Sequence, residues 1–215
     1  MTGRIRVWDG VVRASHWAIA TLIPLCWWTA EQGEMEWHQT CAYLLLAVIL
    51  TRTFWGLVGS DTARLAPLVR SPGSVLGYLR QWRGQRQPSL GHNPAGGYMV
   101  LLMLALITAQ LVTGLFATDD ILTEGPLYGW VSYDTASTLT TLHKRIFDAI
   151  TIALGLHLLA ILVYRLKGIP LVSAMITGRQ RLSAPAPTMR PIWPAALVFV
   201  TSLGAVTYLL ILPLW

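Results

Sequence analysis

The chain has 215 residues, of which 54% are hydrophobic and only 12% are charged. A soluble domain carries roughly 25% charged residues, so this composition excludes an ordinary soluble domain and indicates an integral membrane protein. The formal net charge of +6 would suit a nucleic-acid-binding protein. The basic residues lie at the ends of apolar segments, however, as membrane topology requires, and we expect no nucleic-acid partner.

Five apolar windows are long enough to cross a membrane, because a helical span takes about 20 residues. They cover about residues 12–30, 37–58, 95–117, 139–165 and 192–214. We therefore predict an all-α integral membrane protein, with a four-helix transmembrane bundle in residues 1–168 and a fifth, C-terminal transmembrane helix in residues 192–215. The stretch 178–191, GRQRLSAPAPTMRP, is polar and rich in proline, so residues 169–191 are expected to form a cytoplasmic linker.

A shorter amphipathic segment, residues 71–84, lies between the second and third windows. Ser71 and Pro72 form a typical helix start, with a capping residue followed by a proline in the first turn. At helical spacing, one face carries apolar side chains and the other carries basic ones: Val75, Leu76, Leu79 and Trp82 against Arg80 and Arg83. The pattern predicts a helix that lies flat on the cytoplasmic membrane surface.

The charges orient the predicted bundle. Fourteen of the sixteen basic residues lie in the N-terminal segment, the second connection and the fourth connection, on one side of the membrane. The loops on the other side carry seven carboxylates, and only Lys144 and Arg145 break the pattern. The positive-inside rule then places the N-terminus in the cytoplasm and the C-terminus in the periplasm. No small-residue cleavage site follows the first window, which we interpret as a retained anchor.

The fourth window contains two histidines, His143 and His157, although imidazoles are costly in hydrocarbon. Fourteen residues separate them, which on an α-helix places them about 40° apart around the axis and about 21 Å apart along it. One metal ion cannot bridge that distance. The helix can instead hold two separate groups, one near each membrane surface.

Two further histidines lie at matching depths on the first two windows. His16 lies near the cytoplasmic start of the first window, at the depth of His157. His38 lies near the outer start of the second window, at the depth of His143. Two stacked bis-histidine sites in a helical bundle are typical of a membrane cytochrome with two b-type haems. The alternative is a proton-relay or hydrogen-bonding role, and zinc is less favoured because no carboxylate or thiolate cluster joins either pair.

Cations near the membrane surfaces would suit the propionates of such haems. Arg13 and Arg52 lie at the depth of the inner pair, and Lys144 and Arg145 at the depth of the outer pair. For each of the four, membrane topology or surface solvation is an equally good explanation.

The two cysteines, Cys26 and Cys41, give neither a metal-binding spacing nor a disulfide framework. No C-x-x-C-H motif is present, which excludes covalently attached c-type haem. We expect both cysteines to be small apolar residues in adjacent spans, and a redox pair is the weaker alternative.

Four stretches resemble, in order, the bacterial cytochrome b561 / nickel–iron hydrogenase b-type cytochrome family. They are RVWDGVVRASHW (6–17), EWHQTCAYLLLAVILTRTFWGLVGSDTARL (36–65), GHNPAGGYMVLLMLALITAQLVTGLF (91–116) and HKRIFDAITIALGLHLLAILVYRLKG (143–168). With MITGRQR (175–181) the resemblance covers about residues 5–181. Each motif is weak alone, but four in sequence with all the histidines in register are fairly specific.

The resemblance implies a four-helix bundle with two b haems that passes electrons across the bacterial inner membrane. It implies His16 and His157 as ligands of the inner haem, and His38 and His143 as ligands of the outer haem. The outer haem would exchange electrons with a periplasmic redox partner, such as a c-type cytochrome or a hydrogenase-like subunit, and the inner haem would work near a quinone. The surrounding membrane lipid is the other expected partner.

The chain is also similar to the cytochrome subunit of membrane formate dehydrogenase, where the quinone lies beside the loop before the third helix. In this sequence that loop contains GHNP (91–94), so the resemblance makes His92 and Asn93 candidates for quinone binding or proton transfer. The alternative is a helix cap, because asparagine before proline is a good helix start.

Two rival functions remain open at this point. Some members of the family resemble superoxide oxidases that pass the electron to quinone, and Lys144 and Arg145 would then attract the anion. A non-redox transporter that uses its histidines as proton relays is the third hypothesis. The fifth helix, which carries neither histidine nor acid, departs from the family core and leaves the identity of the redox complex open.

Overall fold

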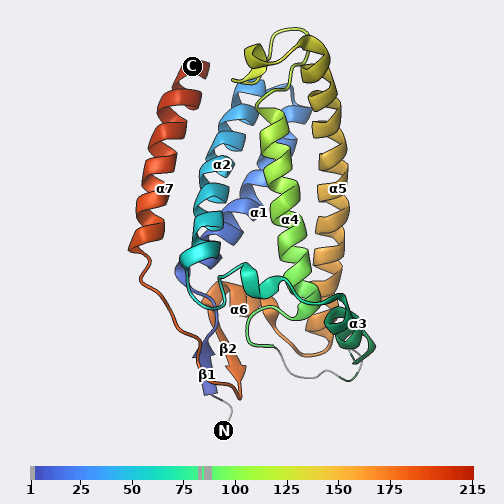
Figure 1. The fold of residues 1–215 in the computed structure, drawn as a ribbon, viewed down its shortest axis with the longest axis vertical. Helices are drawn as coiled ribbons and strands as arrows, with labels where there is room; N and C mark the ends of the chain where they lie inside the picture. The colour runs from blue at the N-terminus through green and yellow to red at the C-terminus, as the bar shows by residue number, and fades with distance from the viewer. Residues whose placement is uncertain (1–2, 82–83, 85–88) are drawn as a thin grey trace.

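The computed structural model describes residues 3–81, 84 and 89–215. Four long helices form a bundle along the longest axis of the molecule (Figure 1): α1 (Gly10–Glu31), α2 (Met35–Val58), α4 (Pro94–Gly114) and α5 (Tyr133–Leu166). A further helix, α7 (Trp193–Val206), lies outside this bundle against α2. Short π-helical and 3-10 turns, Thr207–Ile211 and Leu212–Leu214, extend α7 at its C-terminal end.

Four helices in the described part of the chain are long and apolar enough to cross a membrane. They are α2, α4, α5 and the continuous helix Trp193–Leu214. The 22 residues of α1 are sufficient in length, but α1 is not among the four. His16 and Pro24 lie inside it and lower its hydropathy. The predicted arrangement of five spans therefore stays a prediction.

The observed helices begin and end within a few residues of the apolar windows, except at the start of α5. This helix begins at Tyr133, well before the predicted start at 139. Ser132 caps it, with its hydroxyl accepting from the N–H of Thr135 at 3.3 Å. Thr140 belongs to the same polar first turns, and its hydroxyl donates a hydrogen bond to the carbonyl of Ala136. An apolar window cannot detect such turns, because their side chains satisfy backbone groups instead of facing lipid.

The helices pack in pairs. α1 lies along α2, and α4 lies along α5, whereas α1 and α5 make hardly any close backbone contact. The two pairs meet through a cluster of apolar side chains at mid-depth: Leu45, Ile49, Ile107, Leu111 and Ile150. α7 packs on α2 through Tyr43, Ala47 and Val206. The small, fully buried Ala47 allows these two backbones to approach closely.

The end of the bundle that carries the N-terminus has structure that the sequence did not predict. Residues 169–191, expected to be a linker, contain a short helix α6 (Leu171–Thr177) and a strand β2 (Arg179–Leu182), which pairs antiparallel with β1 (Gly3–Arg6). Gly178 joins α6 to β2 with φ 74°, and its carbonyl accepts from the N–H groups of Val7 and Trp8 at 2.8 and 3.1 Å. A Cβ at this glycine would lie 2.7 Å from the Trp8 carbonyl oxygen, so only glycine fits the turn.

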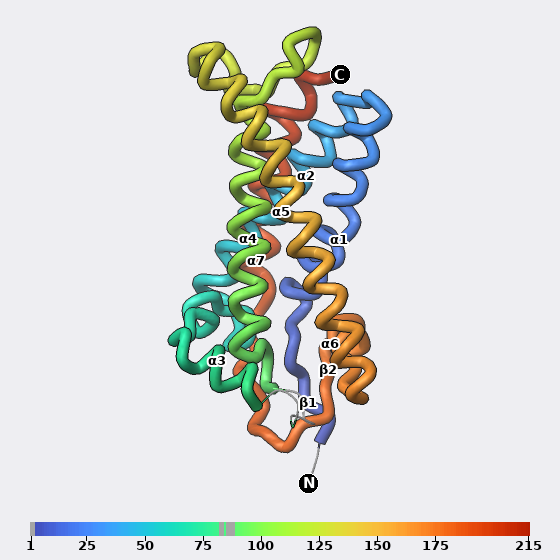
Figure 2. Tube along the Cα trace, turned by 90° about the vertical axis from the view of Figure 1, so that its right-hand side faces the viewer, coloured from blue at the N-terminus to red at the C-terminus, as the bar shows by residue number. Residues whose placement is uncertain are grey.

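The predicted amphipathic helix is α3 (Pro72–Gln81), which lies across the same end of the bundle as α6 and the strands (Figure 2). None of its residues is buried. Its placement on a membrane surface stays a prediction, and Trp82, Arg83 and Arg86 lie outside the described residues.

Candidate functional sites

The four histidines of the long helices meet as two pairs. His38 of α2 faces His143 of α5, with ring centroids 6.4 Å apart and ring planes at 79°. His16 of α1 faces His157 of α5, with centroids 6.5 Å apart and planes at 52°. The structure thus brings together the histidines that the depth argument paired. Their role as ligands stays a prediction.

These separations fit one metal ion between the two rings of each pair. Two imidazoles that bind an ion from opposite sides have centroids about 6.2 Å apart, given a metal–nitrogen bond of roughly 2.0 Å and a ring radius of about 1.1 Å. The described residues contain no group of three or more His, Cys, Asp or Glu side chains that could hold a metal ion. A haem iron needs only two axial side chains because the macrocycle supplies the other ligands.

The outer pair is oriented by backbone carbonyls. The Nδ1 of His38 donates to the carbonyl of Cys26 at 2.8 Å, and the Nδ1 of His143 donates to the carbonyl of Gln110 at 2.9 Å. A hydrogen bond from Nδ1 fixes the ring and leaves the lone pair of Nε2 for a ligand. The Gln110 amide nitrogen now lies 3.0 Å from the Nε2 of His143, so an ion bound there would displace it.

Gly114 brings α4 close to the outer pair. A Cβ at this position would lie 3.0 Å from Cε1 and 3.3 Å from Nδ1 of His143. The hydroxyl of Thr113 also lies 3.2 Å from this Nδ1. α4 therefore forms one side of the outer site, although it carries no histidine.

The inner pair lacks such carbonyl contacts among the described residues. The Nδ1 of His16 is buried without a hydrogen-bond partner, and so is the Nη1 of Arg52 on α2. Arg52 is only 5% exposed. A buried guanidinium nitrogen without a partner is costly, and a carboxylate such as a haem propionate would satisfy it.

A buried acid that the sequence reading missed lies beside this site. Asp9 is 1% exposed; its Oδ1 accepts from the N–H of Val12 at 2.9 Å and caps α1. Its Oδ2 accepts from the indole N–H of Trp55 at 2.8 Å. An aspartate directly before an apolar window is a typical N-cap signal, which would have identified the cap but not the contact with Trp55.

Arg13, proposed from the sequence for a haem propionate, binds α6 in the structure. Its Nε donates to the carbonyl of Met175 at 3.1 Å, and an Nη donates to the carbonyl of Ile176. These are carbonyls of the last turn of α6, where a cation is favoured. Arg13 therefore ties α1 to α6, and a contact with a propionate stays a prediction.

Asn93 caps α4, and the helix cap was one of the two roles predicted for it. Its Oδ1 accepts from the N–H of Gly96 at 2.8 Å, and its Nδ2 donates to the hydroxyl of Tyr164 on α5 at 3.0 Å. That hydroxyl also hydrogen-bonds the hydroxyl of Tyr78 on α3. Burial raises the pKa of Tyr78. The chain Asn93–Tyr164–Tyr78 joins three helices at the end of the inner site.

The ring of His92 packs against Trp8, with centroids 4.7 Å apart. Its Nδ1 is buried without a hydrogen-bond partner. Burial, with a smaller contribution from the cationic Arg52, lowers the pKa of His92 to about 4, so the ring is neutral at pH 7. It offers an unused polar atom beside the inner pair.

Lys144 and Arg145 lie exposed on α5 next to His143. Arg145 lines a shallow groove of about 330 Å³ with Ser137, Thr138, Thr141 and Leu142. Both cysteines, Cys26 and Cys41, are free. A disulfide between them is therefore not formed in this structure.

A comparison with known families settles the class of protein. The family described as prokaryotic cytochrome b561 matches residues 7–178. The chain belongs to this family. The resemblance read from the four stretches is confirmed, and this cytochrome b561 is a multi-pass membrane protein that binds b-type haem and transfers electrons. No curated protein and no solved structure gives a significant match.

The two ends of the matched segment lie in contact. Its first residue, Val7, donates its N–H to the carbonyl of its last, Gly178, at 2.8 Å. The four paired histidines lie inside the segment, whereas α7 lies outside it. α7 is therefore an addition to the family core.

Proposed function

We propose that this protein is a di-haem cytochrome b of the bacterial inner membrane. It transfers electrons between a quinone on the cytoplasmic side and a redox partner in the periplasm. The observation that carries the proposal is the pair of imidazole–imidazole separations, 6.4 and 6.5 Å, each of which suits bis-histidine ligation of one iron. Bound haem supplies one-electron chemistry, and His16/His157 and His38/His143 are its proposed inner and outer ligands.

In this proposal all five long helices cross the membrane. α1 lies antiparallel beside α2 along its length. If α2 crosses the membrane, α1 therefore crosses it as well. The excess of Lys and Arg at the end with α3, α6 and the N-terminus supports a cytoplasmic position for that end. The C-terminus, at the opposite end of α7 (Figure 1), is then periplasmic.

The proposed quinone site lies beside the inner pair, near His92 and Asn93. Quinone reduction takes up protons and quinol oxidation releases them, so the site needs polar groups with free hydrogen-bonding capacity. The unpartnered Nδ1 of His92 is such a group, and Arg52 carries an unpartnered Nη1. Arg52 is the proposed partner of an inner propionate, whereas Asn93 acts by holding the start of α4.

The proposed periplasmic docking surface is the segment between α4 and α5, which projects beyond the other chain segments at this end (Figure 2). The Oδ1 of Asp119 accepts from three N–H groups, those of Ile121, Leu122 and Thr123. This turn holds Ile121 at 82% and Leu122 at 92% exposure. Exposed apolar side chains inside a charged rim are typical of a protein interface.

This docking segment is held over the outer pair. The amide of Gln39, next to His38, donates to the carbonyl of Glu124 at 3.0 Å. A Cβ at Gly125 would lie 2.6 Å from the carbonyl of Gly114, the residue that packs on His143. The carboxylates of Asp119, Asp120 and Glu124 favour a basic partner such as a c-type cytochrome or a basic face of a hydrogenase-like subunit.

The experiment is quinol-driven reduction of a basic soluble c-type cytochrome by the purified, haem-loaded protein. We expect turnover that falls with ionic strength, and about tenfold slower transfer in Ile121→Ser/Leu122→Ser. The matched control is Leu166→Ser, since Leu166 is 78% exposed at the cytoplasmic end. Equal rates in the docking variant and the wild type would contradict the proposed surface, and no transfer in any form would contradict the proposed partner class.

The second candidate function is a superoxide oxidase that passes electrons to quinone. Lys144 and Arg145, exposed beside His143, would attract an anion, although the surrounding carboxylates oppose it. Quinone-coupled superoxide consumption that falls in Lys144→Gln/Arg145→Gln would favour this function over the first.

A further inference from the structure

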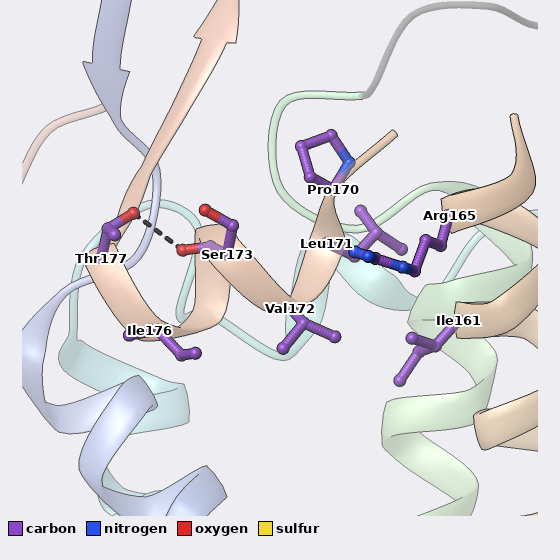
Figure 3. Close-up of a pocket in the computed structure, with 8 residues that line it drawn as sticks. All are labelled: Ile161, Arg165, Pro170, Leu171, Val172, Ser173, Ile176 and Thr177. Atoms are coloured by element: carbon purple, nitrogen blue, oxygen red, sulfur yellow. Dashed lines mark hydrogen bonds between the residues drawn. The ribbon is translucent and has the colours of Figure 1, made fainter. Parts of the chain in front are cut away.

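A groove lies between the end of α5 and α6, outside the sites described so far. It has a volume of about 270 Å³ and is lined by Ile161, Arg165, Pro170, Leu171, Val172, Ser173, Ile176 and Thr177. Figure 3 shows Val172 and Ile176 on one side of α6 and Ser173 on the opposite side. Ile161 and Arg165 come from the end of α5, and the side chain of Arg165 extends toward Leu171 at the start of α6. The groove therefore has apolar walls from Ile161, Val172 and Ile176, and polar groups from Arg165 and Ser173.

The polar side of the groove has unused binding capacity. Among the described residues, neither the guanidinium of Arg165 nor the hydroxyl of Ser173 makes a hydrogen bond or an ion pair, although the Ser173 carbonyl accepts from the hydroxyl of Thr177 at 2.8 Å. The apolar side is uncovered as well, with Val172 at 41% and Ile176 at 55% exposure. A ligand that fits both sides must itself be amphiphilic.

We propose that this groove binds an anionic phospholipid, independently of the proposed electron partners. The phosphate lies at Arg165 and Ser173, and an acyl chain runs along Ile161, Val172 and Ile176. Arginine binds phosphate through two parallel hydrogen bonds, and basic pockets between helices at the cytoplasmic surface suit anionic headgroups. The groove at Arg145, lined mostly by Ser and Thr side chains, has a cation but no comparable apolar wall.

The position of this lipid gives it a mechanical role at the inner pair. Ile161 follows His157 by about one helical turn on α5. α6 is tied to α1 by the bonds from Arg13, which lies about one turn before His16. α1 and α5 themselves hardly touch. A lipid seated between α5 and α6 therefore braces the two helices that carry the inner histidines.

The test uses the full-length, haem-loaded protein in nanodiscs of phosphatidylcholine with and without phosphatidylglycerol. We expect phosphatidylglycerol to raise Tm in the wild type and Arg145→Gln, but not in Arg165→Gln. Native mass spectrometry should show about tenfold less retained phosphatidylglycerol in Arg165→Gln, the factor for the loss of one charge-assisted contact. An equal Tm rise or equal retention in Arg165→Gln and the wild type would overturn the proposal.

Two further arms separate a lipid from other occupants. Inorganic phosphate should leave Tm unchanged, because it lacks the acyl chain, and Val172→Ser/Ile176→Ser should lose retained phosphatidylglycerol while keeping its haem absorption. Stabilisation by phosphate alone would identify a simple anion site. Displacement of phosphatidylglycerol by added long-chain quinone would identify a quinone groove. Either result would overturn the lipid assignment.

Discussion

The outer and inner histidine pairs are built differently. Both imidazoles of the outer pair donate a hydrogen bond from Nδ1 to a backbone carbonyl. Gly114 lets α4 approach His143 closely. At the inner pair, the Nδ1 of His16 and the Nη1 of Arg52 are buried without partners, and the helices that face each other hardly touch. The chain itself orients both outer imidazoles, whereas buried polar atoms at the inner pair lack partners. In our proposal these inner groups are completed by what binds there: a haem, a quinone and a lipid.

The largest expected effect comes from removing one histidine of α5. His157→Ala should abolish the inner haem only, and His143→Ala the outer haem only, because about 21 Å separates them along the helix. Resolved α-bands in low-temperature difference spectra measure which haem remains. Loss of the inner haem in His38→Ala would contradict the pairing by depth.

The buried acid beside the inner pair should have the next largest effect. Asp9→Ala removes the cap of α1 and the bond to Trp55, and we expect a loss of roughly 2–3 kcal/mol in stability. Asp9→Asn keeps the capping oxygen and should lose less. Thermal unfolding of the haem-loaded protein measures both variants. If Asp9→Ala unfolds at the wild-type temperature, Asp9 does not hold this end of the bundle.

A smaller effect is expected from pH. The pKa of His92 is about 4 in the folded protein and about 6.5 in an unfolded chain. The unfolded state therefore binds the proton first, and stability contributed by neutral His92 is lost as pH falls from about 6.5 to about 4. His92→Gln should show a shallower fall in Tm over this window. Parallel Tm curves for the two proteins would show that His92 is not held neutral.

The sequence predicted the histidine pairs better than their surroundings. Depth on a helix follows from residue spacing alone, so spacing was sufficient to match His143 and His157 to their partners. The cap at Asn93 was also predicted, because its signal is local. Asp9 with Trp55 and Arg13 with α6 were missed, since each joins segments distant in the chain. The pairing of β1 with β2 was missed for the same reason, and β2 itself lies in the proline-rich stretch 178–191 that we interpreted as a linker.

The haem content of the purified protein decides whether both histidine pairs bind iron. A pyridine haemochrome assay, with the protein quantified by amino-acid analysis, should give about two b haems per chain, one for each bis-histidine pair. The same assay on His143→Ala and His157→Ala should give about one. A wild-type content of one haem or none would contradict the proposal that both pairs ligate iron.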